Sequence, residues 1–333
     1  MATLAVFRPA ISQAEPRLIS PKTGLSAQNL AVIVNTSDPE SVEIGSYYQL
    51  KRQIPVENII RISFPPGEKT MSRSQFNQLK TAVDNQTPAR IQAYALTWTE
   101  PYRVDCMSVT AAFAFGFDIR HCASGCHPTQ TNPYFDSLTS DPHTQFGMRP
   151  TMALAGENLN EVKRLIDRGV AADGTHPKGT VYLLDTHDTA RNVRSSEYPQ
   201  IIEKTGQMLN ISHIHADHID HRQDILMYFT GLTSVSRLKE NAFLPGAIAD
   251  HLTSLGGLLT DSSQMSALRW LEAGATGSYG TVVEPCNFLA KFPHPGVIII
   301  HYTGGDTLIE AYWKSVLMPG QGIFIGEPLA KPY

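Results

Sequence analysis

The stretch Asn29-Leu-Ala-Val-Ile-Val-Asn35, followed by Ser37-Asp38-Pro39-Glu40, decides the fold class. The first segment is a short apolar run with β-branched residues, which is typical of a strand buried on both faces. The second begins a helix, because it supplies a serine cap, a proline for the first turn and a glutamate that completes a capping box. This helix is predicted to end where Ile54-Pro55 stops it.

The alternation of strand and helix then repeats and predicts a parallel sheet with right-handed crossovers. Further helices are predicted at Ser74 to Asn85, about Asn158 to Arg168 and about Thr307 to Val316, the last one before Gly322 to Gly326. Further strands are predicted at Asn58 to Phe64, Arg90 to Trp98, Pro150 to Ala155, Gly179 to Asp185, Ile225 to Thr230, Gly246 to Ala249, Gly274 to Val283 and Val297 to Tyr302. The predicted fold class is therefore a three-layer α/β/α arrangement around a mostly parallel sheet.

Composition limits the domain organisation and the partners. The 333 residues are 42% hydrophobic and 17% charged, as in ordinary folded proteins. We predict an N-terminal tail over residues 1–28, a single α/β domain over 29–333, and an insertion at about 105–150. The net charge of -4 gives no indication of a nucleic-acid partner. The expected partner is a peptide, a protein or a small molecule.

The sequence also bears on the compartment. No apolar run reaches the roughly 18 residues that span a bilayer, so no transmembrane segment is predicted. Arg8 and Pro9 interrupt the short apolar patches of the N-terminus and no basic region precedes them, so no signal peptide is predicted. The default expectation is the cytoplasm, where the four cysteines would be thiols; a periplasmic or exported protein is the alternative if the start is misassigned.

Functional groups of an open parallel sheet gather beyond the carboxyl ends of its strands. Many residues at such positions are instead caps and turns. The candidate positions are Asn35 and Thr36, Thr97 to Glu100, Asp185 to Asp188, Thr230 and Gly231, Asp250 to Ser254, and Glu284 to Cys286.

A histidine-rich motif suggests a metal site. His213-Ile-His215-Ala-Asp217-His218 resembles the H-x-H-x-D-H spelling of the metallo-β-lactamase superfamily, and implies zinc or another divalent metal on His213, His215, Asp217 and His218. The preceding segment, Gln207 to Ser212, is a weak strand, whereas the superfamily has a strongly apolar one. The alternative is a solvated loop before the Ile225 strand, and no cofactor is then predicted.

A second cluster is His121-Cys122-Ala-Ser-Gly-Cys126-His127. It could contribute two cysteines to a metal, or form a local disulfide in an oxidising compartment, but free structural thiols are the main expectation. Cys286 is a possible nucleophile if His251 lies near it.

Several motifs together resemble a bacterial family without an assigned reaction, which is found in bacteria that carry exosortase, the PEP-CTERM protein-sorting transpeptidase. The resemblance implies a role around envelope or exopolysaccharide systems. The motifs are Leu30 to Asn35 with Ser41 and Tyr47-Tyr48, Ile54 to Asn58, Gly246 to Gly257, Trp270 to Gly280, Val283 to Cys286, Glu310 to Ser315 and Gly326 to Leu329.

The order of elements in the C-terminal half is similar to that of gingipain-type, caspase-fold cysteine peptidases. Those use a histidine after one strand and a cysteine after the next. This chain departs from the pattern at both positions, because Phe229-Thr230-Gly231-Leu232 has no histidine and Ala249-Asp250-His251-Leu252 has no cysteine.

Three functional hypotheses follow. The first is a caspase-fold-like hydrolase with a relocated site, lined by Asp250, His251 and Ser254 with Cys286 or His187 contributing. The second is a non-catalytic binding or accessory protein of an envelope or exosortase-linked system. The third is a metal-dependent hydrolase built on the cluster from His213 to His218.

Overall fold

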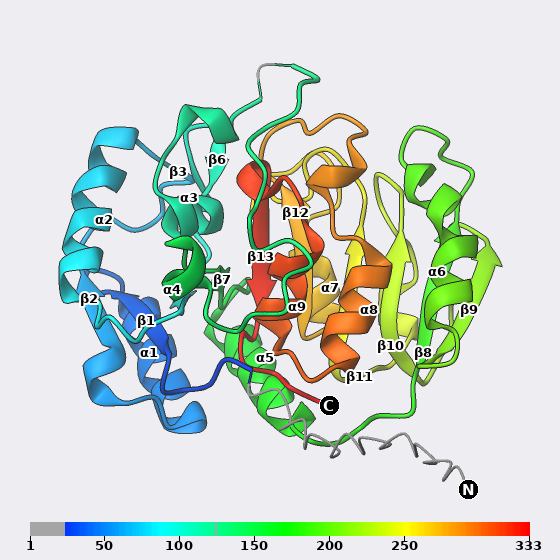
Figure 1. Ribbon diagram of the computed structural model, residues 1–333, viewed down its shortest axis with the longest axis horizontal. Helices are drawn as coiled ribbons and strands as arrows, with labels where there is room; N and C mark the ends of the chain where they lie inside the picture. Colours follow the sequence, from blue (N-terminus) through cyan, green and yellow to red (C-terminus); the bar gives the residue numbers. More distant parts are fainter. Residues whose placement is uncertain (1–23, 124) are drawn as a thin grey trace, which may run out of the picture.

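A computed structural model describes residues 24–123 and 125–333 (Figure 1). Most of the predicted tail, residues 1–23, therefore lies outside the described residues. In the described part of the chain, the main sheet has ten strands in the order β2-β1-β4-β7-β13-β12-β11-β10-β8-β9, and a small second sheet has the order β3-β5-β6. The strands are β1 (Leu30–Asn35), β2 (Ile59–Ile62), β3 (Thr70–Met71), β4 (Ala93–Leu96), β5 (Arg103–Val104), β6 (Met107–Ser108), β7 (Thr151–Ala153), β8 (Thr180–Asp185), β9 (Asn210–His215), β10 (Ile225–Thr230), β11 (Phe243–His251), β12 (Gly277–Thr281) and β13 (Gly322–Gly326).

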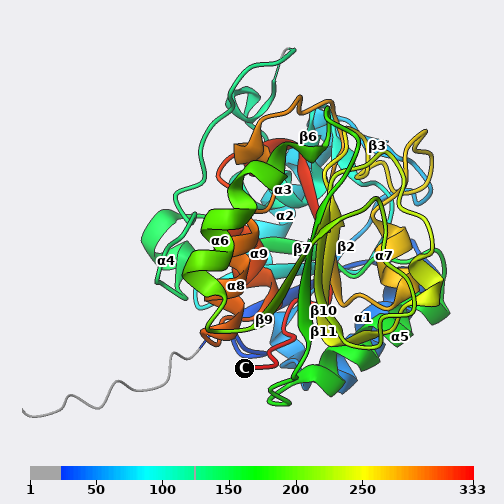
Figure 2. The same ribbon diagram turned by 90° about the vertical axis from the view of Figure 1, so that its right-hand side faces the viewer.

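Helices cover both faces of the main sheet. In the side view of Figure 2, α3, α6, α8 and α9 lie on one face, and α1, α5 and α7 lie on the other. This arrangement confirms the predicted three-layer α/β/α class. The helices are α1 (Pro39–Arg52), α2 (Arg73–Gln86), α3 (Val109–Phe115), α4 (Pro142–Phe146), α5 (Leu159–Ala172), α6 (Tyr198–Thr205), α7 (Leu268–Ala273), α8 (Pro295–Thr303) and α9 (Leu308–Ser315).

The first strand and helix form as their residues predict. All six side chains of β1 are buried, and β1 pairs in parallel with β2 on one side and β4 on the other. Asp38, one residue after the predicted cap, caps α1 by accepting a hydrogen bond from the amide of Glu40. Parallel pairing continues from β4 to β7 and among β8, β10 and β11, whereas β12 and β13 pair antiparallel. The sheet is therefore mostly parallel.

One predicted strand is wrong. Val297 to Tyr302 lies in helix α8, although its β-branched run suggests a strand. Pro295 occupies the first turn, and the side chain of His294 accepts a hydrogen bond from the amide of Val297. The helix packs between α6 and α9, and this burial outweighs the weak strand preference of isoleucine.

The segment predicted as an insertion, residues 105–150, contains helices as well as loops. Helix α3 contacts β4, β7 and β13 and connects β4 with β7, so it is a crossover helix of the sheet. The remainder carries β6, α4 and the connecting loops.

The four cysteines form two disulfides. Cys106 bonds to Cys122, and Cys126 bonds to Cys286, with Cα atoms 5.5 and 5.4 Å apart. The expectation of free thiols is therefore wrong, and the partner of Cys126 comes from 160 residues along the chain. Within the described residues, no helix combines the length and apolar character needed to cross a bilayer.

Candidate functional site

Asp250, a predicted site residue near the end of β11, lies in the interior of the protein. Its carboxylate is 1% exposed and pairs with the guanidinium of Arg194, with Nη2 and Oδ1 2.6 Å apart. The same Nη2 donates a hydrogen bond to the carbonyl of Thr230. Burial raises the pKa of Asp250 above its ordinary value, while the neighbouring Arg194 acts in the opposite direction. The pair joins the segment after β8 to the ends of β10 and β11.

His251, the last residue of β11, is enclosed. Its side chain is 2% exposed, Nδ1 accepts a hydrogen bond from the indole Nε1 of Trp270, and Nε2 lies 3.0 Å from the carbonyl oxygen of Met265. Because an indole N–H donates and a carbonyl accepts, the ring carries its proton on Nε2 and neither nitrogen is left for a substrate. Burial lowers the pKa of His251 to about 4.

The other predicted catalytic residues lie at the same edge but are divided between two cavities. Ser254 and Cys286 line one small cavity of about 190 Å³, where Cys286 is already bonded to Cys126. His187 lines a separate, open hollow and pairs with Asp217. The structure thus gathers these residues along one edge of the sheet without bringing His251, Cys286 and His187 to a common cavity.

A larger crevice of about 540 Å³ opens at the carboxyl ends of β1, β4 and β7. Strand β1 has β2 on one side and β4 on the other, so the chain reverses its direction across the sheet here. Such switch points are where open α/β sheets bind ligands. The walls come from the segments after these three strands, from the loop after β11 and from the start of α7. They include Asp38, Thr97 to Glu100, Gly156 to Asn158, Leu259 and Arg269.

The crevice has acidic walls. Asp38, Glu40, Glu100 and Glu157 line it, whereas Arg269 is the single lysine or arginine among its described walls. Arg269 is itself paired with Glu157, and its Nη2 lies 2.7 Å from Glu272 Oε1. The crevice therefore keeps a net negative charge.

A buried donor without a partner belongs to one of the residues that line the crevice. Trp98 is 3% exposed and lines the crevice, and its Nε1 has no hydrogen-bond partner among the described residues. Buried donors without a partner are uncommon in proteins, because each costs about 1–3 kcal/mol. Thr99 fixes the adjoining wall, since its hydroxyl donates to the carbonyl of Gly156 and accepts from its amide.

At the corresponding position in the C-terminal half, the chain itself lies close to the strand ends. Strand β8 lies between β9 and β10, which creates a second switch point. The chain itself passes across it: a β-carbon on Gly231 would overlap the carbonyl oxygen of Arg191, and Arg194 enters the interior to reach Asp250. Gly231 therefore permits a close backbone approach at this position.

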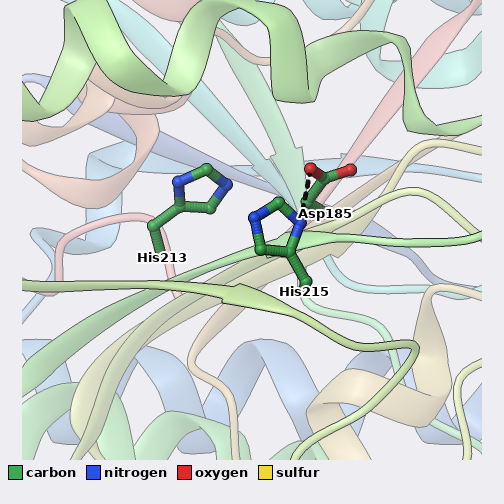
Figure 3. Close-up of side chains that lie close together, drawn as sticks. All are labelled: Asp185, His213 and His215. Carbon is green, nitrogen blue, oxygen red and sulfur yellow. Dashed lines mark ion pairs between the residues drawn. The ribbon is translucent and has the colours of Figure 1, made fainter.

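A third group of side chains lies at the opposite edge of the sheet from β2. His213 and His215 are two positions apart on the edge strand β9, so their side chains lie on the same face of the sheet. His215 pairs in register with Asp185 of β8. Figure 3 shows Asp185, His213 and His215 projecting from the same side of the two strands. Atoms able to bind a metal, one on each residue, all lie within 4.8 Å of one another.

Only half of the predicted metal-binding set takes part in this group. Asp217 instead pairs with His187 and also accepts a hydrogen bond from its amide at 3.1 Å. His218 is absent from the group. Asp185 takes the place of these two residues. Asp185 was among the candidates at strand ends, but no pattern in the sequence joins it with His213, because β9 resembles a loop.

No protein-family model matches this chain, and no curated protein gives a significant match. Among solved structures, a complex of the pro- and mature domains of the Porphyromonas gingivalis gingipain RgpB is similar with a TM-score of 0.53 and 8% identity, covering 91% of this chain and 79% of that one. A structure described as a protease has a TM-score of 0.46 and 10% identity, covering 93% of this chain and 79% of that one. The first likeness establishes a gingipain-like, caspase-like α/β fold.

Proposed function

We propose that this protein is a non-catalytic binding protein that uses a gingipain-like fold to hold a positively charged ligand. The observation that carries the proposal is the enclosure of His251. It is the one histidine on the two segments where the resemblance expects a catalytic dyad, and both of its ring nitrogens are engaged inside the protein. A general base has to reach the proton that it removes, and this imidazole lines none of the three cavities described above.

The alternative of a relocated hydrolase site receives little support. Cys286 is held in a disulfide, so it lacks the thiolate that a nucleophile needs. Ser254 shares a cavity with Cys286 and Arg191, but no histidine lines that cavity. A serine without a neighbouring base is a weak nucleophile.

The switch-point crevice supplies the binding site in this proposal. Its four carboxylates favour a cation, because Arg269 is the single lysine or arginine among its described walls. A lysine or arginine side chain of a partner peptide has the matching charge and an apolar stem to lie against Ile44 and Leu259. We therefore propose a basic peptide segment as the ligand class.

The two disulfides favour an oxidising compartment, such as the periplasm or the cell exterior, over the cytoplasm. A binding protein in that location agrees with an accessory role in an envelope or exosortase-linked system, which the family resemblance implies.

The proposal is tested with fluorescein-labelled tetra-arginine, tetra-lysine and tetra-glutamate peptides by fluorescence anisotropy. We expect the two basic peptides to bind and the acidic one not to. Glu100→Gln removes one wall carboxylate and should weaken binding about two- to fivefold, as expected for one partly exposed ion pair. The matched control is Glu203→Gln, on the exposed surface of α6.

Mass spectrometry of the peptides after overnight incubation separates binding from catalysis. The proposal predicts intact peptides. Cleavage that disappears in Ser254→Ala would instead establish the hydrolase, and equal loss of binding in Glu100→Gln and Glu203→Gln would remove the crevice as the site.

A further inference from the structure

We propose that Asp185, His213 and His215 form a binding site for a divalent metal ion of the zinc class at the edge of the main sheet. The site is independent of the crevice and of the ligand proposed for it. The sequence predicts a metal site on His213, His215, Asp217 and His218. The site proposed here keeps the first two ligands, and Asp185 replaces the other two.

The geometry needs little rearrangement. A tetrahedral zinc ion with bonds of about 2.0 Å places its ligand atoms roughly 3.3 Å apart. Here His215 Nδ1 and Asp185 Oδ2 are 2.8 Å apart, and the three ligand atoms lie within 4.8 Å of one another. His213 and His215 are exposed, so small rotations of their side chains close the remaining gap. Two imidazoles and one carboxylate are a common set of zinc ligands.

Neighbouring residues hold this group in position. Asn192 donates a hydrogen bond from its side-chain amide to Asp185 Oδ1, and its own carbonyl oxygen accepts the amide of Thr186 at 3.0 Å. This leaves Oδ2 of Asp185 directed at His215. The ring of Tyr198 meets the ring of His213 edge to face, with centroids 5.5 Å apart. Outer partners of this kind orient the ligands of metal sites.

A second group provides an internal comparison. Asp220, His221 and Glu240 also offer ligand atoms within 4.8 Å of one another. Arg237 occupies that group, with its Nη1 2.9 Å from Asp220 Oδ2 and 3.3 Å from Glu240 Oε2. A guanidinium neutralises the carboxylates and repels a metal ion. No lysine or arginine in the described parts of the chain forms an ion pair with Asp185, so its charge is available to a cation.

Binding replaces the hydrogen bond between His215 and Asp185 with two bonds to the metal. The proton on Nδ1 of the neutral ring moves to the exposed Nε2 through solvent, so no net proton is released from this ring. Three protein ligands leave the fourth position of a tetrahedral zinc ion open for water, as in catalytic zinc sites.

The test is isothermal titration of ZnCl₂ into the full chain, after removal of any affinity tag and treatment with EDTA. We expect one equivalent of Zn²⁺ to bind, with at least tenfold weaker affinity in His213→Gln, His215→Gln and Asp185→Asn. His221→Gln is the matched control and should bind as the parent protein does. All of these substitutions are at exposed or half-exposed positions, and circular dichroism verifies that each variant is folded.

A second measurement uses the unchanged protein. Paramagnetic Co²⁺ should shift the ring resonances of His213 and His215 before those of His221. The proposal is overturned if no Zn²⁺ binds, if the His213 and His215 variants retain the parent affinity, or if His221→Gln is the variant that loses the metal.

Discussion

The enclosure of His251 predicts a specific dependence of stability on pH. The ring is 2% exposed, and its pKa is about 4 in the folded protein against about 6.5 in an unfolded chain. Above pH 6.5 the ring is neutral in both states. Between pH 6.5 and 4 the unfolded chain binds a proton that the folded protein refuses, so the free energy of unfolding falls as the pH is lowered.

The size of the effect follows from the two pKa values. Each pH unit between them costs about 1.4 kcal/mol, so His251 should remove about 3 kcal/mol of stability between neutral pH and pH 4. His121 is also buried with a pKa lowered to about 4 and adds its own loss to that of the parent protein. The difference between the parent and His251→Gln isolates the contribution of His251.

Urea unfolding at pH 7.5, 6.5, 5.5 and 4.5, followed by both fluorescence and circular dichroism, measures this difference. His251→Gln should be less stable than the parent at pH 7.5, because Trp270 and Met265 lose their partner. The gap in the free energy of unfolding should narrow towards pH 4.5. The control is His127→Gln, at an exposed position. A gap that does not change with pH, or an NMR titration of the His251 ring with a midpoint near 6.5, would refute the enclosure and return His251 to the list of catalytic candidates.

Two further predictions concern stability. Replacing Cys126 and Cys286 by serine opens a link between residues separated by 160 positions and should cost about 5 kcal/mol by the chain-entropy model; a melting temperature equal to that of the parent protein would contradict a folded-state disulfide. Asp250→Asn leaves the charge of the buried Arg194 uncompensated and should lower the free energy of unfolding, measured in urea, by about 3–5 kcal/mol. The double variant Arg194→Met/Asp250→Leu should lower it by less than Arg194→Met or Asp250→Leu alone. If the costs of the two substitutions simply add, the two side chains are not coupled.

The sequence predicted the sheet better than it predicted the helices that cover it. Strands such as Leu30–Asn35 and Ile225–Thr230 are short apolar runs buried on both faces, and these were recognised. The same criterion failed at Val297 to Tyr302, because a short run of buried isoleucines has no period that separates a strand from a helix. Pro295, at the first turn of that segment, was the available signal.

The candidate site was only partly accessible from sequence. The rule of strand ends selected Thr97 to Glu100 and Asp185, which do lie at the crevice and at the histidine group. It also selected Asp250 and His251, and nothing local indicates that these two are covered by Arg194 and Trp270. The pairing of Asp185 with His215 depends on the register between β8 and β9, which a polar edge strand does not reveal.

The segment that passes close to the C-terminal switch point makes the two halves of the sheet unequal. A molecule that bound at that position would have to displace the segment around Arg191. Only a few residues link this segment to the end of β8, so its effective concentration there is high. Arg194 holds this segment in place, because moving Arg194 away would leave the carboxylate of Asp250 unpaired in the interior. The two switch points therefore differ in structure: the chain passes close to the strand ends at one, and a crevice of about 540 Å³ opens at the other.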